Sequence, residues 1–143
     1  MTFLVERLAE LRKHLDHLYA IRGSVGDAQA LERDLTLRND VLFSLMMIAQ
    51  LVIDAAGEVA AREGLRFEDY TGAVRSLAGV EGFPERLVES LARLPGFRNV
   101  LLHEYVELDL GVVLRALGEL EPVEDFIECV AAYIERTEAD GPA

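Results

Sequence analysis

The sequence predicts an all-α fold, a bundle of four main helices and one short helix. Leucines recur at alternating intervals of four and three residues near the beginning of the chain, which is typical of one face of a packed helix. These leucines are Leu4, Leu8, Leu11, Leu15 and Leu18. Residues 41–61 are apolar almost all round, as in a helix at the centre of a bundle. No stretch of the sequence alternates apolar and polar residues in the manner of a strand.

Length and composition indicate one globular domain. The chain has 143 residues, of which 51% are apolar and 28% charged, and these values are ordinary for a domain with its own core. We predict that the domain spans residues 1–137 and that residues 138–143 form a frayed tail. The first residues are too charged for a signal peptide, and the most apolar run, 41–53, is shorter than the ~20 residues that span a membrane. We therefore expect a cytoplasmic protein without a membrane anchor.

The first two helices are predicted from the residues at their ends. Thr2 is expected to cap the first helix, which we expect to end at Gly23. After a turn, Asp27 is expected to cap a long central helix that runs to Gly64. The polar exceptions on this helix are Arg33, Arg38, Asp40, Gln50 and Asp54. A carboxylate buried there must be hydrogen-bonded or paired, so we favour a structural role over a catalytic one for Asp54.

The second half of the chain is predicted to hold the remaining helices. Residues 67–78 form the short one, and Pro84 stands at the first position of the next. Pro95 and Gly96 interrupt that helix, which either ends there or kinks before a second part begins afresh. A closing amphipathic helix then runs to the tail. The residues that mark its start and its expected bends are Asp109, Gly118 and Pro122.

Charge is distributed unevenly along the chain. The formal net charge is −12. Through Arg66 there are 8 basic and 10 acidic residues, whereas from Phe67 onward there are 6 and 16. A field of this sign disfavours avid non-specific binding to nucleic acid, and DNA is not expected as a ligand. Screening acts beyond about 8 Å at physiological salt, so a small local cluster can still hold one phosphate. The acidity can instead face a basic partner protein.

The residues suited to chemistry gather in residues 96–105, which contain Arg98, Asn99, His103 and Tyr105. The sequence lacks glycine-rich phosphate loops, the H-E-x-x-H zinc motif, cysteine pairs, EF-hand loops and G-x-S-x-G, so most enzyme classes are excluded. Arginine offers planar donors that suit a phosphate, and histidine transfers protons near neutral pH. Together they could cleave a phosphodiester bond without a metal, with the 2′-hydroxyl of RNA as the nucleophile.

The spacing of these residues poses a geometric problem. On an ideal helix Arg98 and His103 diverge by about 140°, so they do not converge on one atom. Convergence requires the long arginine to reach around the helix, a distortion at Pro95 and Gly96, or a second copy of the helix in a symmetric dimer. The dimer is attractive because an isologous contact would place each Arg98 and His103 beside the partner's pair in one shared cleft.

The R-x4-H-x-Y motif of the HEPN superfamily matches this sequence at Arg98, His103 and Tyr105. Residues 96–105 as a whole resemble the HepT-like ribonuclease toxins. The resemblance extends to the central helix around residues 50–54 and covers most of the chain. It implies a HEPN-type bundle, a homodimer and a metal-independent endoribonuclease that needs no cofactor of its own. By this resemblance His103 is the general base or acid, Arg98 stabilises the charge on phosphorus, and Asn99 orients the ring or donates to the phosphate.

The resemblance also implies a partner protein. HepT-like toxins pair, in type VII-like toxin–antitoxin systems, with a minimal, MntA-like nucleotidyltransferase antitoxin, which in some systems transfers AMP to the motif tyrosine. In this sequence that tyrosine is Tyr105. The added phosphate would compete for the guanidinium of Arg98, which lies seven residues away on a neighbouring helical face. The magnesium and ATP of that reaction would belong to the partner.

A non-enzymatic function remains as the alternative. In it the chain is a dimeric helical module that docks a nucleotidyltransferase and cleaves nothing. The acidic residues close to the motif, Glu104, Glu107 and Asp109, favour this alternative because their charges weaken affinity for RNA. A local basic patch near Arg98 would favour the enzyme.

Overall fold

The structure, a computed structural model, describes residues 2–103 and 106–139, and every regular element in these ranges is helical. The α-helices are α1 (Thr2–Ile21), α2 (Ala28–Arg33), α3 (Leu35–Arg62), α4 (Tyr70–Ser76), α5 (Glu85–Leu91), α6 (Leu94–His103), α7 (Leu110–Gly118) and α8 (Glu121–Ala139). Two short 3-10 turns, Arg22–Ser24 and Leu77–Gly79, follow α1 and α4. The predicted all-α fold is confirmed.

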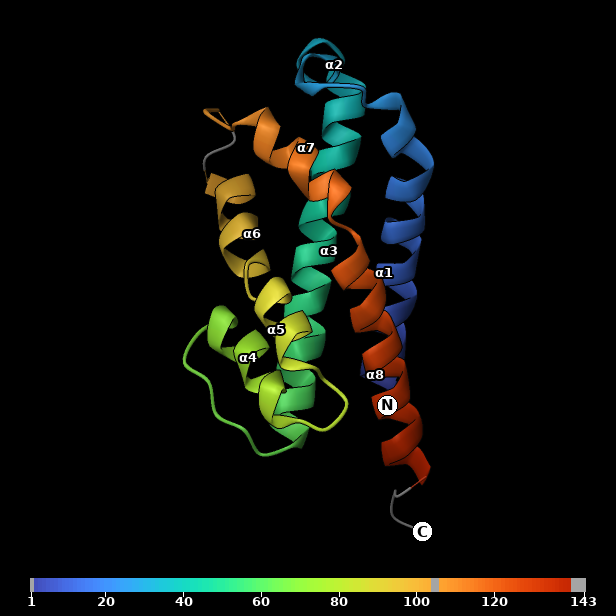
Figure 1. Cartoon of the computed structure of the whole chain (residues 1–143), viewed down its shortest axis with the longest axis vertical. Coiled ribbons are helices and arrows are strands. Elements are labelled where there is room, and N and C mark those ends of the chain that lie inside the picture. The colour runs from blue at the N-terminus through green and yellow to red at the C-terminus, as the bar shows by residue number, and fades with distance from the viewer. Residues whose placement is uncertain (1, 104–105, 140–143) are drawn as a thin grey trace.

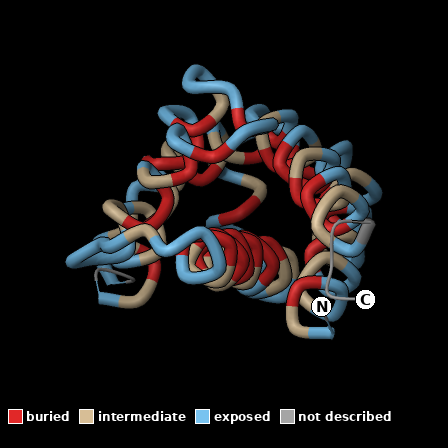
Figure 2. Tube along the Cα trace, turned by 90° about the horizontal axis from the view of Figure 1, so that it is seen from below, coloured by how far each residue is buried: buried red, intermediate tan, exposed pale blue. Residues whose placement is uncertain are grey.

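The bundle is organised around α3. Helices α1 and α8 run alongside it on one side, α4 to α6 follow one another on the other side, and α7 crosses near the end that holds α2 (Figure 1). Buried residues face one another around a common interior, as Figure 2 shows. On α1 the fully buried side chains lie at the predicted helical spacing. They are Leu4, Leu11, Leu15 and Leu18.

Helix α3 is long and apolar enough to cross a membrane by length and composition, but 56% of its most apolar window is buried inside the bundle. The core helix of a soluble protein has the same properties.

Two histidines of α1 contact this helix: Nδ1 of His14 lies 3.1 Å from Ser44 Oγ, and Nε2 of His17 lies 2.8 Å from Asp40 Oδ1. These contacts attach α1 to α3.

The two longest predicted helices are each divided in the structure, so their prediction as continuous helices is wrong. Asp34 adopts φ −113° and ψ 97°, which ends α2, and its carboxylate accepts a hydrogen bond from the Leu37 N–H at 3.0 Å. An aspartate that bonds a backbone N–H in this way caps a new helix. The closing helix likewise ends at Gly118, and α8 begins afresh at Glu121 with Pro122 in its first turn, where a proline has no N–H to lose.

The break predicted at Pro95 lies just before α6. Helix α5 ends at Leu91, and Pro95 is the second residue of α6, a position where proline is tolerated. The helix then continues without interruption to His103. At the other end of the chain α8 extends to Ala139, two residues into the predicted tail, and residues 140–143 lie outside the described part.

Candidate functional site

Three helices hold the guanidinium of Arg98. Its Nε donates to Gln50 Oε1 of α3 at 2.5 Å, and its Nη1 donates to Asn99 Oδ1 at 3.1 Å. Its Cζ lies 5.6 Å from the centre of the Tyr70 ring at the start of α4, which is within the range of a cation–π contact. Arg98 is half-buried between these partners. The guanidinium is therefore fixed from outside its own helix.

Gln50 links Arg98 to a carboxylate without bringing the two charges together. Its Nε2 donates to Asp54 Oδ1 at 2.7 Å, one turn further along α3. Because the amide oxygen accepts from Arg98 and the amide nitrogen donates to Asp54, both ends define its orientation. A neutral amide thus separates the guanidinium from the carboxylate. No described residue forms a salt bridge with Arg98, and only two of its five N–H groups have described partners.

The chain after α3 places Tyr70 beside Arg98. Gly64 adopts φ 70°, a left-handed conformation that favours glycine, and turns the chain out of α3. Asp69 then caps α4 by accepting a hydrogen bond from the Gly72 N–H at 2.7 Å. Tyr70, the first residue of α4, remains 50% exposed.

His103 is the last residue of α6 and is exposed. Since α6 is uninterrupted from Arg98 to His103, the two side chains diverge by about 140° and lie about 7.5 Å apart along the axis. The proline lies before Arg98 and cannot change this angle. The arginine side chain extends to Gln50 rather than around the helix. Of the three routes to convergence, the one that requires a second copy of the chain agrees best with this geometry.

Of the two other predicted site residues, the structure describes Asn99 but not Tyr105. Asn99 is exposed and bonds Arg98 through its side-chain oxygen, which leaves its amide N–H groups available to a ligand. Tyr105, the predicted modification site, lies outside the described residues. Among residues 2–103 and 106–139, no cluster of three or more His, Cys, Asp or Glu side chains could hold a metal ion.

Sequence reasoning missed the network that holds Arg98: Gln50 and Tyr70, which contact the guanidinium, and Asp54, which accepts from Gln50. One signal was present for Gln50 and Asp54. They are polar residues four apart on a helix that is otherwise apolar, a spacing that places both on one face. Nothing in the sequence pairs that face with residue 98, which lies 48 positions away from Gln50.

Known proteins resemble this chain over most of its length. The model of a family described as Ribonuclease HepT-like matches residues 5–130. The mRNA nuclease HepT of Shewanella oneidensis is 24% identical over 131 residues, which cover 90% of this chain and 96% of that protein.

Solved structures share the fold. A toxin–antitoxin crystal structure with AMP-PNP matches with a TM-score of 0.81 and 20% identity, covering 92% of this chain and 98% of that chain. The tri-AMPylated HEPN toxin of Shewanella oneidensis in complex with its MNT antitoxin matches with a TM-score of 0.80 and 23% identity, again covering 92% and 98%. These likenesses confirm the HEPN-type helical bundle.

Proposed function

This chain belongs to the HepT-like ribonuclease family, and we propose that it is the toxin of a type VII-like toxin–antitoxin pair, an endoribonuclease that acts in the cytoplasm as a homodimer and without a metal ion. The observation that carries the proposal is the guanidinium of Arg98 within the R-x4-H-x-Y motif. Gln50 fixes its position, and this neutral amide separates it from the carboxylate of Asp54. Three N–H groups of the guanidinium point to no described partner and suit a phosphate.

The proposed reaction uses the nucleophile that RNA carries. The 2′-oxygen attacks the adjacent phosphorus, the bond from phosphorus to the 5′-oxygen breaks, and the products are a 2′,3′-cyclic phosphate and a 5′-hydroxyl. One imidazole takes the proton of the 2′-hydroxyl, and one gives a proton to the departing 5′-oxygen. In a homodimer the His103 of each copy can supply one of these roles. Arg98 donates to the phosphate oxygens, where negative charge increases in the transition state.

The face of α3 that carries Gln50 supports the dimer. Phe43, Gln50 and Asp54 lie seven and four residues apart on α3, which places them on one face of that helix. Phe43 is 54% exposed and Tyr70 is 50% exposed, while Gln50 and Asp54 are half-buried. Large exposed apolar side chains beside a polar network are typical of a surface that another protein covers. A second copy placed here would bring its own Arg98 and His103 to the same cleft.

We propose that a nucleotidyltransferase antitoxin neutralises the toxin by adenylylating Tyr105. The support is the motif tyrosine itself and the solved relative, which is a tri-AMPylated toxin in complex with its antitoxin. In this reaction the phenol oxygen attacks the α-phosphate of ATP, the bond to the β-phosphate oxygen breaks, and pyrophosphate leaves. The new phosphodiester adds negative charge two residues after His103, and it competes with RNA for the donors of Arg98.

One experiment tests cleavage and neutralisation together. The purified protein is expected to cleave an RNA pool in excess EDTA, and to stop doing so after incubation with its antitoxin, Mg²⁺ and ATP followed by repurification. Tyr105→Phe, which has no phenol oxygen to modify, is expected to cleave before and after that incubation. Intact mass reports the adenylyl groups. Wild-type protein that is folded, dimeric and unmodified yet cleaves no RNA would favour the non-catalytic docking module instead.

Gln50 is expected to act as a positioning residue for Arg98. Gln50→Ala removes one charge-assisted hydrogen bond from the guanidinium, and we expect kcat for RNA cleavage to fall about tenfold, the equivalent of ~1.4 kcal/mol. The affinity for RNA should change little, because Arg98 keeps its charge. The matched control is Gln29→Ala on α2, whose side chain contacts none of these residues. Equal kcat values for Gln50→Ala and wild type, at equal unfolding midpoints, would refute the positioning role.

A further inference from the structure

A basic hollow lies on α4 and α5, and none of its lining residues belongs to the side chains that hold Arg98. It encloses about 470 Å³, and its lining residues are Arg75, Arg86, Glu89, Ser90, Ala92 and Arg93. Three arginines and one glutamate give it a local excess of two positive charges in a chain whose net charge is −12. Residues 67–103 carry four arginines against five acidic residues, whereas residues 104–143 carry two against eleven. The basic residues of the second half are thus concentrated in one part of the bundle.

Stabilising ion pairs do not explain the hollow. Arg75 Nε lies 3.4 Å from Glu89 Oε1, and both side chains are 59% exposed, so this pair contributes little to stability. The side chains of Arg86 and Arg93 have no partner among the described residues, and both are exposed. Arg86 and Arg93 therefore line the hollow without a described acidic partner, and guanidinium groups in this state are suited to a phosphate.

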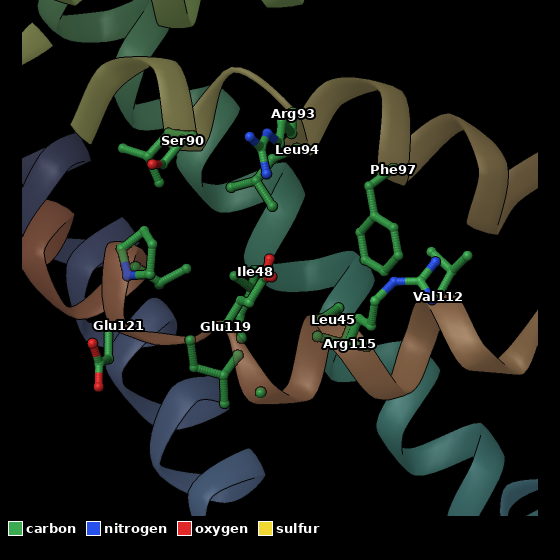
Figure 3. A pocket seen from close by; sticks show the side chains of 16 residues that line it. Leu45, Ile48, Ser90, Arg93, Leu94, Phe97, Val112, Arg115, Glu119 and Glu121 are labelled. Atoms are coloured by element: carbon green, nitrogen blue, oxygen red, sulfur yellow. The ribbon is translucent and has the colours of Figure 1, made fainter. Parts of the chain in front are cut away.

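The hollow adjoins a larger and more apolar cleft. Ser90 and Arg93 line both. The cleft encloses about 620 Å³ between the α5–α6 segment and the α7–α8 segment, with Leu45 and Ile48 of α3 at its floor. Figure 3 shows Phe97 projecting from α6 into this cleft, with Arg93 above it on the same side. Arg93 thus lines both the basic hollow and a cleft that contains an aromatic ring, and Arg115, Glu119 and Glu121 are the other charged residues of that cleft.

A nucleotide has these same two parts, a phosphate and a flat apolar base. Proteins that bind single-stranded nucleic acid combine a basic groove for the backbone with aromatic side chains on which bases stack. A base that is paired inside a duplex cannot enter a cleft of this kind, whereas an unpaired base can. The arrangement thus favours a single strand over a duplex.

We propose that Arg75, Arg86 and Arg93 hold the phosphodiester backbone of single-stranded RNA, and that one unpaired base enters the adjoining cleft against Phe97. The proposal rests on the proposed ribonuclease function and names the form of RNA that the toxin selects. This surface supplies affinity and orientation, while the chemistry stays with Arg98 and His103. Phe97 and Arg98 are neighbours on α6, so a strand bound in the cleft lies against the helix that carries the catalytic motif.

Binding of a 2′-O-methylated oligonucleotide tests the proposal without cleavage, because the methyl group blocks the nucleophile. Fluorescence anisotropy of a labelled single strand is recorded over a range of salt concentrations. For Arg86→Gln/Arg93→Gln, we expect the slope of log K against log salt to fall by about 0.7 per arginine, and the affinity at low salt to fall roughly tenfold. Lys13→Gln/Arg33→Gln is the matched control, since it removes the same charge from exposed positions on α1 and α2.

Two further variants separate the parts of the site. Glu89→Gln removes the acidic partner of Arg75 and is expected to tighten RNA binding, an outcome that a purely structural role does not predict. Phe97→Leu keeps an apolar side chain but removes the ring, so binding of the single strand should weaken while the salt slope stays unchanged. Duplex RNA should bind less tightly than the single strand to the wild-type protein.

The possible outcomes distinguish this proposal from the ribonuclease function. A salt slope and affinity equal to wild type in Arg86→Gln/Arg93→Gln would overturn the backbone site, even if the protein cleaves RNA. An arginine-dependent single-strand affinity in a protein that cleaves nothing would support this site and contradict the ribonuclease. AMP that binds as tightly as the oligonucleotide, and loses affinity in the same variant, would assign the hollow to a free nucleotide and overturn the RNA proposal.

Discussion

His103→Ala is expected to lower the rate of RNA cleavage by about 10²–10⁴-fold, the range that one general acid–base group contributes. The imidazole is the group in the motif that can both accept the proton of the 2′-hydroxyl and return one to the leaving oxygen. In a homodimer the substitution removes both copies at once, so base and acid are lost together and the loss should lie at the upper end of this range or beyond it. The measurement is a single-turnover cleavage rate in excess EDTA with a defined RNA.

Folding and assembly must be matched in this comparison. The side chain of His103 is exposed and forms no described hydrogen bond in residues 2–103 and 106–139, so its replacement should leave the unfolding midpoint unchanged. His17→Ala is the appropriate control, because His17 is also an exposed helical histidine, and its described contact is to Asp40, which is not a residue of the proposed site. Cleavage by His103→Ala at the wild-type rate would remove His103 from the proposed mechanism.

Arg98→Lys is expected to lose about 10²–10³ in kcat although the positive charge is retained. The guanidinium is planar, and it donates to Gln50 and Asn99 while further N–H groups remain for a phosphate. An ammonium is a point charge on a flexible chain and cannot satisfy these three partners in one geometry. Arg98→Ala should lose at least as much activity and also bind RNA less tightly.

The control for this prediction is Arg33→Lys on α2, an exposed arginine whose Nε contacts only the carbonyl oxygen of Gln29. It should cleave like the wild type. If Arg98→Lys retained activity within about threefold of wild type, a positive charge at this position would be sufficient for catalysis. The arrangement of N–H donors that Gln50 sets would then not contribute to kcat.

The sequence predicts those parts of the fold that depend on local periodicity. The leucine spacing of α1, the apolar character of α3 and the cap at Asp109 all appear as expected. Asp34 was missed because an aspartate at that position suits both the polar face of a continuous helix and the cap of a new one. Its extended backbone conformation decides between them, and that conformation depends on how α2 packs.

The candidate site was predicted only along α6. Arg98, Asn99 and His103 stand close together in the sequence, so a motif can reveal them. The contact from Arg98 to Gln50 spans 48 positions, and Tyr70 reaches the guanidinium from α4. Such contacts follow from the packing of α3 against α4 and α6, which side-chain periodicity does not encode. The sequence shows Gln50 and Asp54 as a polar pair on one face of a helix, but it does not show that Gln50 contacts Arg98.

Arg98 and His103, the two groups of the proposed chemistry, are held by parts of the fold that differ in rigidity. Gln50, which holds Arg98, belongs to the 28-residue helix at the centre of the core, and core helices are among the last parts of a fold to open. His103 is the terminal residue of a ten-residue helix, where backbone hydrogen bonds fray readily. Moderate heating should therefore misalign the proton-transfer group before it disturbs the phosphate-binding group. The rate of RNA cleavage should then fall at temperatures at which the toxin still binds RNA and the bundle is still folded.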